Sequence, residues 1–272
     1  MKREGIWLVL LAAVGTTLLG LFQYWAPNEW ASMAVWTGIV GVLVGLVCLI
    51  KPARRAGAGI VVAGLVLFAA GMLWPAPLQR AQGQTKLDEI FPEYHFAERH
   101  THKIHAAPEC VAEALEQTTF DDIKVYYTLV RIRAFALRIK HANDGLPPGS
   151  ARILDVLRDP KSPFVPLYRD PREIVMGLVG YARPYTQPPD VHDLAAFQAF
   201  REPDSVRIAF NLRITGDGGG WSTITSETRL LVVGDRARRA TGRYWRVICP
   251  GSGMIRRMWL NAVEARATGS RS

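Results

Sequence analysis

Three ionisable side chains, Glu98, His100 and His102, alternate along residues 94–105, so a strand there places them on one face. Imidazoles two residues apart could bind a metal, with Glu98 adding an oxygen ligand. His100 could also transfer protons with Glu227 or Glu98 as the orienting carboxylate. The sequence places no third histidine clearly near them and no nucleophile motif beside His100. A histidine-rich strand without metal is therefore favoured, and we predict no cofactor.

A second polar set, Thr225, Glu227 and Arg229, alternates along residues 222–233. If both strand faces meet around a cavity, the carboxylates and Arg229 could anchor a polar head group while apolar neighbours line a pocket. The alternative is a buried ion-pair cluster that holds no ligand. The candidate cavity residues are Phe96, Glu98, His100, His102, Phe210, Leu212, Thr225, Glu227, Arg229 and Trp245, with Ile104 as further apolar lining.

The elements that must position these residues follow from hydrophobic periodicity. Alternation and turn residues predict strands at 94–105, 164–168, 173–181, 206–215 and 222–233. Helical spacing predicts helices at 107–117, 121–139 and from 235 to about 267, the last one interrupted at residues 250–253. The order of one strand, two helices, several antiparallel strands and a long C-terminal helix predicts an α+β fold.

This order and several motifs resemble the START-like (SRPBCC, helix-grip) superfamily, in which a curved antiparallel sheet surrounds a long C-terminal helix and a deep cavity. The resemblance covers most of residues 90–267 and is closest to an uncharacterised bacterial branch. It is carried by residues 87–94, 98–100, 107–111, 226–229, 243–248 and 250–257. It implies a helix-grip domain, but superfamily members carry lipids, bind hormones or cyclise polyketides, so the resemblance does not imply one activity.

The N-terminal part contains three stretches without Asp, Glu, Lys or Arg, at residues 6–25, 31–50 and 56–74. Each approaches the roughly 20 apolar residues that cross a bilayer. We expect residues 1–75 to form a membrane anchor of three transmembrane helices, residues 76–89 a linker, and residues 90–272 the soluble domain. The pair Gly41 and Gly45 could let two of these helices approach closely, and the alternative is that glycine is simply common in membrane helices.

Basic residues in the short loops predict the orientation of this anchor, because such residues favour the cytoplasmic side. The N-terminus carries Lys2 and Arg3, and the loop after the second stretch carries Lys51, Arg54 and Arg55. With three crossings the soluble domain emerges on the outer side, periplasmic or extracytoplasmic, of a cell inner membrane. A cleaved signal peptide is the alternative for the first stretch, but aromatic residues at its end favour a retained helix.

Composition narrows the function classes. The hydrophobic content is 49% and the formal net charge is +9. No basic run resembles a nucleic-acid motif, and charge-free spans argue against a pump or channel. Cys110 and Cys249 lie in predicted helices, where a disulfide between them is possible outside the cytoplasm, although buried free cysteines are common.

The leading hypothesis is a membrane-anchored protein that binds an apolar or amphipathic small molecule, such as a lipid, without chemical change. Its expected partners are membrane lipids and a hydrophobic small molecule, with no nucleic acid. A cyclase-like or hydrolase-like enzyme that uses His100 and nearby carboxylates is the second hypothesis. A structural or interaction module whose cavity is filled by its own side chains is the third.

Overall fold

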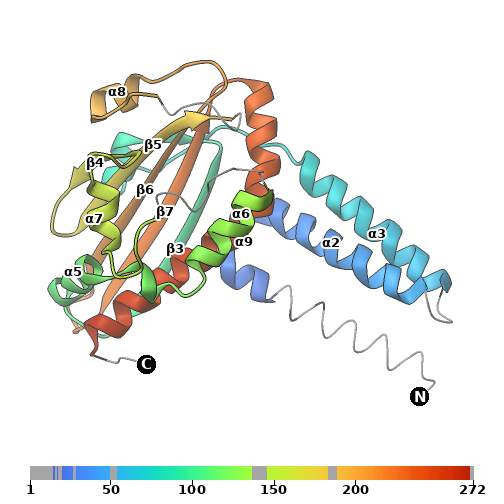
Figure 1. Cartoon of the computed structure of the whole chain (residues 1–272), viewed down its shortest axis with the longest axis horizontal. Coiled ribbons are helices and arrows are strands. Elements are labelled where there is room, and N and C mark those ends of the chain that lie inside the picture. Colours follow the sequence, from blue (N-terminus) through green and yellow to red (C-terminus); the bar gives the residue numbers. More distant parts are fainter. Residues whose placement is uncertain are drawn as a thin grey trace. The chain divides into compact units, whose positions relative to one another are not determined.

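A computed structural model of the chain describes residues 15, 17, 20–26, 29–49, 54–136, 146–182 and 189–269. The chain divides into two compact units (Figure 1). The first comprises Met1–Pro75 with Gly242–Pro250, and the second comprises Ala76–Thr241 with Gly251–Ser272. A short segment of the last helix therefore belongs with the N-terminal helices.

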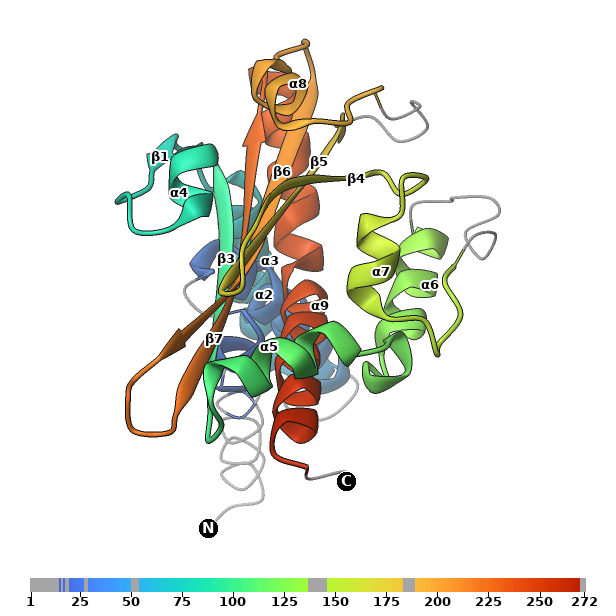
Figure 2. The same cartoon turned by 90° about the vertical axis from the view of Figure 1, so that its left-hand side faces the viewer.

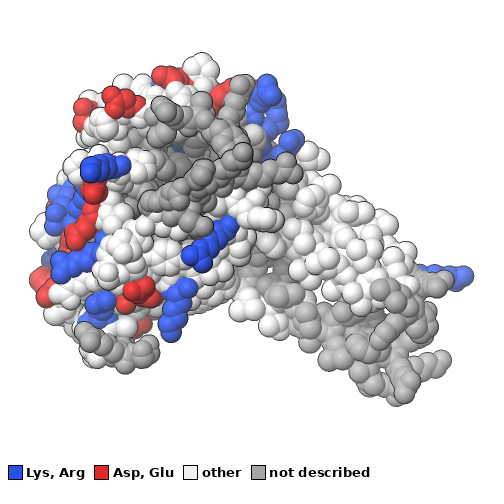
Figure 3. All heavy atoms as spheres, in the orientation of Figure 1, with Lys and Arg blue, Asp and Glu red and all other residues white. Residues whose placement is uncertain are grey.

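Two helices of the first unit, α2 (Trp30–Leu49) and α3 (Arg54–Leu73), are long and apolar enough to cross a membrane. Only 22% and 17% of their most apolar windows are buried, unlike the core helix of a soluble protein. Figure 3 shows mostly uncharged surface over the described part of this unit, and neither α2 nor the part of α3 after Arg55 contains a charged residue. They match two of the three predicted spans. The predicted span at residues 6–25 lies largely outside the described residues, of which 20–25 are helical.

Glycines allow α2 and α3 to approach closely. A Cβ atom built on Gly64 would lie 2.8 Å from the carbonyl oxygen of Gly38, and one on Gly45 would lie 2.8 Å from the nitrogen of Val61. A Cβ on Gly41 would lie 3.3 Å from the Cα of Gly64. The close approach predicted at Gly41 and Gly45 is therefore confirmed, and small residues are what membrane helices use for such packing.

The segment Gly242–Pro250 contributes Arg246 to the same unit. Arg246 Nη1 donates to the carbonyl oxygen of Met72 at 2.7 Å, and its Nη2 donates to that of Trp74. Both carbonyls lie at the C-terminal end of α3, where unpaired carbonyl groups and the helix dipole favour a cation. Arg246 thus satisfies the end of the second apolar helix.

The second unit is built on a five-stranded antiparallel sheet in the order β3-β7-β6-β5-β4. The strands are β3 (Phe96–Ile104), β4 (Phe164–Arg169), β5 (Glu173–Tyr181), β6 (Ser205–Gly216) and β7 (Ser222–Val232). All five predicted strands are present, and the first pairs with the last. The α+β class is therefore confirmed, together with a long C-terminal helix, α9 (Asp235–Ala267).

Helices cover both faces of this sheet (Figure 2). On one face, α5 (Pro108–Gln117), α7 (Ile153–Arg158) and the C-terminal part of α9 bury a large apolar core with Phe210, Leu212 and Trp259. On the other face, two short helices, α4 (Lys86–Ile90) and α8 (Leu194–Ala199), bury a smaller core. We call these the α9 face and the α4 face.

Three segments differ from expectation. The predicted interruption at residues 250–253 is wrong, because α9 continues through Pro250. The proline removes one backbone donor, and buried residues both before and after it, such as Cys249 and Trp259, hold the helix in place. The predicted linker contains β1 (Gln79–Arg80), which pairs with β2 (Glu93–Tyr94), and most of α4. The predicted helix at 121–139 is instead a 3-10 turn, Phe120–Asp122, followed by α6 (Tyr126–Ala136), and its last three residues lie outside the described part.

Candidate functional site

The register between β3 and β7 separates the two predicted polar sets. Glu98 lies opposite Thr228 and His100 lies opposite Ser226, whereas Glu227 lies opposite Arg99. Since neighbours across an antiparallel pair share a face, Glu98 and His100 point to the α9 face, and Glu227 points to the α4 face. The expectation that these polar sets meet in one cavity is therefore wrong.

On the α9 face, Glu98 and His100 form a buried pair, with 2.5 Å between Glu98 Oε1 and His100 Nε2. Their side chains are 1% and 0% exposed. Within the described part of the chain, Glu98 Oε2, His100 Nδ1, Ser226 Oγ and Trp259 Nε1 are buried without a hydrogen-bond partner. The pair is thus buried but not fully satisfied.

The other predicted residues of this face serve in packing and in a surface pair. Phe210, Leu212 and Ile104 belong to the apolar core, and Phe96 is also buried. His102 Nε2 lies 2.7 Å from Glu264 Oε2 of α9, at the edge of the sheet. No group of three or more His, Cys, Asp or Glu side chains suited to a metal occurs among the described residues. Much of the space expected for a ligand beneath α9 is thus filled by side chains.

On the α4 face, Arg229 joins strand β7 to helix α4. Its Nη2 pairs with Asp88 Oδ1, its Nε donates to Glu227 Oε1 at 2.7 Å, and its Nη1 donates to the carbonyl oxygen of Phe91 at 3.1 Å. Burial alone would raise the pKa of Asp88, but hydrogen bonds from Arg229 and from the backbone of Gln84 outweigh it and lower that pKa. Arg229 and Glu227 therefore hold the segment after α4 in place.

The start of α4 is fixed by two carboxylates. Thr85 and Asp88 form a reciprocal capping box, with Thr85 Oγ1 accepting from the Asp88 nitrogen at 3.1 Å. Glu173 of β5 accepts from the backbone nitrogen of Lys86 at 3.1 Å and from Asn211 Nδ2 at 2.7 Å. The first-turn donors of a short helix are thereby tied to the sheet, which gives a firm wall to the pocket beside it.

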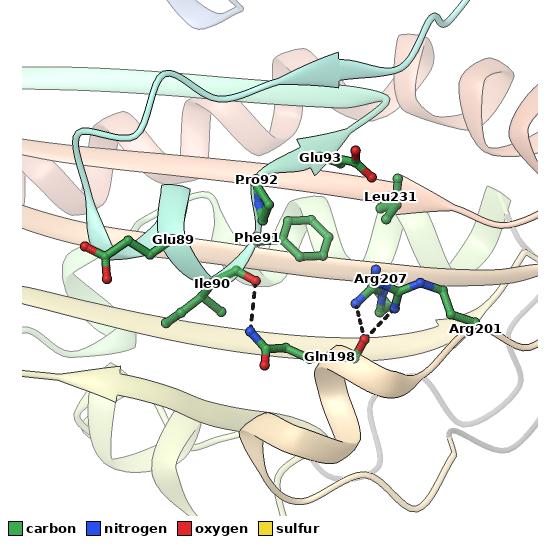
Figure 4. A pocket seen from close by; sticks show the side chains of 9 residues that line it. All are labelled: Glu89, Ile90, Phe91, Pro92, Glu93, Gln198, Arg201, Arg207 and Leu231. Atoms are coloured by element: carbon green, nitrogen blue, oxygen red, sulfur yellow. Dashed lines mark hydrogen bonds between the residues drawn. The ribbon is translucent and has the colours of Figure 1, made fainter.

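A pocket of about 250 Å³ opens on the α4 face between α4, α8 and the sheet (Figure 4). Ile90, Phe91, Pro92 and Leu231 give it an apolar lining. The polar lining residues are Glu89, Glu93, Gln198, Arg201 and Arg207. Gln198 Nε2 donates to the carbonyl oxygen of Ile90 at 3.3 Å and so links α8 to α4. The pocket thus offers apolar surface beside two cations.

None of the predicted site residues lines this pocket. Arg229 and Glu227 support one of its walls, Thr225 lies partly buried on the same sheet face, and Trp245 is buried in the α9 segment that belongs to the first unit. Among the described residues, Cys110 and Cys249 form no disulfide with each other.

Sequence reasoning missed all the lining residues, and the most informative of them is Arg207, near the start of an otherwise well-predicted strand. The alternation of β6 puts Arg207, Ala209 and Asn211 on the face opposite Phe210. That face would be solvent-exposed in a sheet covered on one side, where an arginine is unremarkable. Its burial depends on α4 and α8, which have five and six residues and are too short to be recognised by periodicity.

No protein-family model, curated protein or solved structure matched this chain when it was compared with them.

Proposed function

We propose that this chain is a membrane-anchored binding protein that holds a small amphipathic molecule in the pocket on the α4 face. The observation that carries the proposal is the mixed lining of this pocket, in which apolar Ile90, Phe91 and Leu231 lie beside Arg201 and Arg207. Ligand sites in proteins typically combine apolar walls with a few placed polar groups.

The size of the pocket favours a head group with the beginning of an apolar chain over a whole lipid. Its volume of about 250 Å³ lies just below the range of about 300–1,000 Å³ that is typical of sites for drug-sized molecules.

The two apolar helices support a membrane source for the ligand. A domain tied to the bilayer meets membrane components at a high effective concentration. The strand order, the first strand pairing with the last and the helix α9 covering one sheet face also support the helix-grip resemblance, which we retain as a proposal for the fold family.

We also propose that the soluble domain lies on the outer side of the inner membrane. The support is Lys51 before α3, Arg54 and Arg55 at its start, and Lys2 and Arg3 at the N-terminus, if the stretch at residues 6–25 is the third crossing as we propose. A reporter enzyme that folds only outside the cytoplasm, fused after Ser272, is expected to be active. Activity from a cytoplasm-specific reporter at the same position would overturn this orientation and leave the binding proposal intact.

The binding proposal is tested by filling the pocket. Leu231→Trp places a large side chain in the pocket lining. Thr223→Trp is the control, because it introduces the same side chain on the same strand and sheet face but outside the pocket. The full chain in phosphatidylcholine nanodiscs is titrated with a monoacylglycerol and with the lysophosphatidic acid of the same chain length.

We expect at least one of these amphiphiles to bind the unaltered chain and Thr223→Trp equally, and to bind Leu231→Trp at least about tenfold more weakly. Binding of neither amphiphile, or equal binding by both variants, would contradict the proposal.

A further inference from the structure

Arg207 is a buried cation on β6, the central strand of the five-stranded sheet. Its residue surface is only 3% exposed. The guanidinium carbon lies 5.2 Å from the ring centroid of Phe91 and 5.7 Å from that of Phe197. Two aromatic rings therefore hold the guanidinium group where the pocket begins, an arrangement that suits a planar cation.

The hydrogen bonds of Arg207 leave its charge without an anionic partner. Its Nη1 donates to the carbonyl oxygens of Phe197 and Gln198 at 3.2 and 3.1 Å. Its Nε is buried and has no partner, and no described carboxylate forms an ion pair with it. A buried charge is costly unless it is paired, because water no longer solvates it.

The group nevertheless stays protonated at neutral pH. Burial, with Arg201 adding to the effect, lowers the pKa of Arg207 to about 10. That value is still well above 7, so the positive charge persists beside the pocket.

A second cation stands next to the first. Arg201 Nη1 donates to the carbonyl oxygen of Gln198 at 2.6 Å, the same oxygen that accepts from Arg207 (Figure 4). Two like charges that converge on one neutral acceptor repel each other, and an anion between or beside them would relieve that repulsion.

The two carboxylates of the pocket lining already have cationic partners outside it. Glu93 Oε1 lies 2.8 Å from Arg80 Nη2, and Glu89 Oε2 lies 2.7 Å from Lys86 Nζ. Glu93 acts on Arg207 only through space, without an ion pair. Arg207 is therefore a buried charge in the pocket lining without an ion-pair partner among the described residues.

We propose that this pocket binds the anionic head group of its ligand, a phosphate monoester or carboxylate, through Arg207, with Arg201 as a second contact at the rim. This inference rests on the proposed function, since it names the chemistry of the molecule that the pocket holds. Both head groups match the fork of N–H donors on a guanidinium group.

The test compares three probes that share one scaffold: lysophosphatidic acid, the monoacylglycerol of the same chain, and glycerol 3-phosphate. The full chain in phosphatidylcholine nanodiscs is titrated with each. The variants are Arg207→Gln, Arg207→Lys and Arg201→Gln, and Arg213→Gln on the same strand and sheet face is the control outside the pocket.

We expect lysophosphatidic acid to bind more tightly than the monoacylglycerol, and Arg207→Gln to weaken only the phosphate-bearing probes, by about 10-fold to 100-fold. Arg207→Lys keeps the positive charge but loses the forked N–H donors of the guanidinium group. Its affinity for the phosphate-bearing probes should therefore lie between those of the unaltered chain and Arg207→Gln. Arg201→Gln should weaken binding less and reduce its dependence on salt. Arg213→Gln should bind as the unaltered chain does.

Glycerol 3-phosphate distinguishes the source of the anion. Binding comparable to that of lysophosphatidic acid supports a free anion, and binding of lysophosphatidic acid alone supports a lipid head group. Equal, pocket-dependent binding of the neutral and charged amphiphiles would overturn this inference but leave the binding function standing. If Arg207→Gln does not fold, unchanged affinity and salt dependence in Arg201→Gln and Arg207→Lys would overturn it equally.

Discussion

Arg201 and Arg207 share one acceptor, the carbonyl oxygen of Gln198, at 2.6 and 3.1 Å. That oxygen lies at the C-terminal end of α8, where helical carbonyl groups lack partners within the helix. Arg207 also donates to the carbonyl oxygen of Phe197, and Arg201 to that of Phe200, each through the same Nη1 atom. A guanidinium group has five N–H donors, so donors on the other nitrogens of both groups stay available. The geometry of a six-residue helix therefore brings two cations to one side of the pocket.

Arg229, Asp88 and Glu227 form a buried ion-pair triad on the α4 face. Removal of Arg229, the cation that the two carboxylates share, should cause a large loss of stability. Arg229→Met leaves Asp88 and Glu227 buried without their common cation, so we expect the free energy of unfolding to fall by about 3–5 kcal/mol. Arg99→Met is the control, because Arg99 is 60% exposed and lies 3.9 Å from Glu227, and it should cost less than about 1 kcal/mol. Urea unfolding of the full chain in nanodiscs measures both. Equal losses would contradict the buried triad.

The same triad predicts how stability responds to acid. The folded protein holds the pKa of Asp88 below its ordinary value of 3.8. A lowered carboxyl pKa contributes stability that is present above the unfolded value and is lost as pH falls through the folded value. Stability should therefore fall as the pH drops below about 4, and less steeply in Asp88→Asn.

Glu116 and Asp122, whose pKa values are also lowered, keep some of this slope in the variant. An Asp88→Asn profile parallel to that of the unaltered chain would refute the assignment.

The buried pair of Glu98 and His100 on the α9 face predicts that replacing His100 costs more stability than replacing His102. His100→Leu leaves the buried carboxylate of Glu98 without its partner, and we expect it to cost about 3–5 kcal/mol. His102→Leu removes a pair whose side chains are 25% and 41% exposed, and should cost less than about 1 kcal/mol. The double variant Glu98→Leu/His100→Leu should recover part of the first loss, since it removes the buried carboxylate but also the negative charge that acts on the guanidinium group of Arg256. A double variant less stable than His100→Leu would show that the pair contributes net stability.

The close packing of α2 against α3 predicts that the cost of replacing a glycine of α3 depends on whether that glycine faces α2. Gly64→Leu forces a side chain against the backbone of Gly38 and Val42 in α2, and should destabilise the pair by about 1–3 kcal/mol. A Cβ at Gly59 of the same helix meets nothing within 4 Å, so Gly59→Leu is the matched control. Resistance of the full chain to unfolding by sodium dodecyl sulfate measures both changes. Similar sensitivity of the two variants would contradict the close approach of α2 and α3.

Sequence periodicity was sufficient for the strands because the alternation in β6 and β7 is long and regular, as Ile208, Phe210 and Leu212 illustrate. It could not predict which polar residues share a face. A shift of one residue in the pairing of β3 with β7 would place Glu98 beside Glu227, and nothing in either strand alone excludes that register.

The pocket was beyond prediction for a different reason. It depends on α4 and α8, which are positioned by distant contacts such as Arg229 with Asp88 and Gln198 with Ile90. Those contacts join residues more than 100 positions apart in the chain. The burial of Arg207 follows from them and leaves no local signature.

The most direct measurement of the central claim is native mass spectrometry of the full chain released from its own membrane in a mild detergent. We expect the unaltered chain and Thr223→Trp to carry a bound small molecule that, once released, ionises as an anion, and Leu231→Trp to lack it. An unaltered chain without any bound molecule, or the same molecule on all three proteins, would contradict the account.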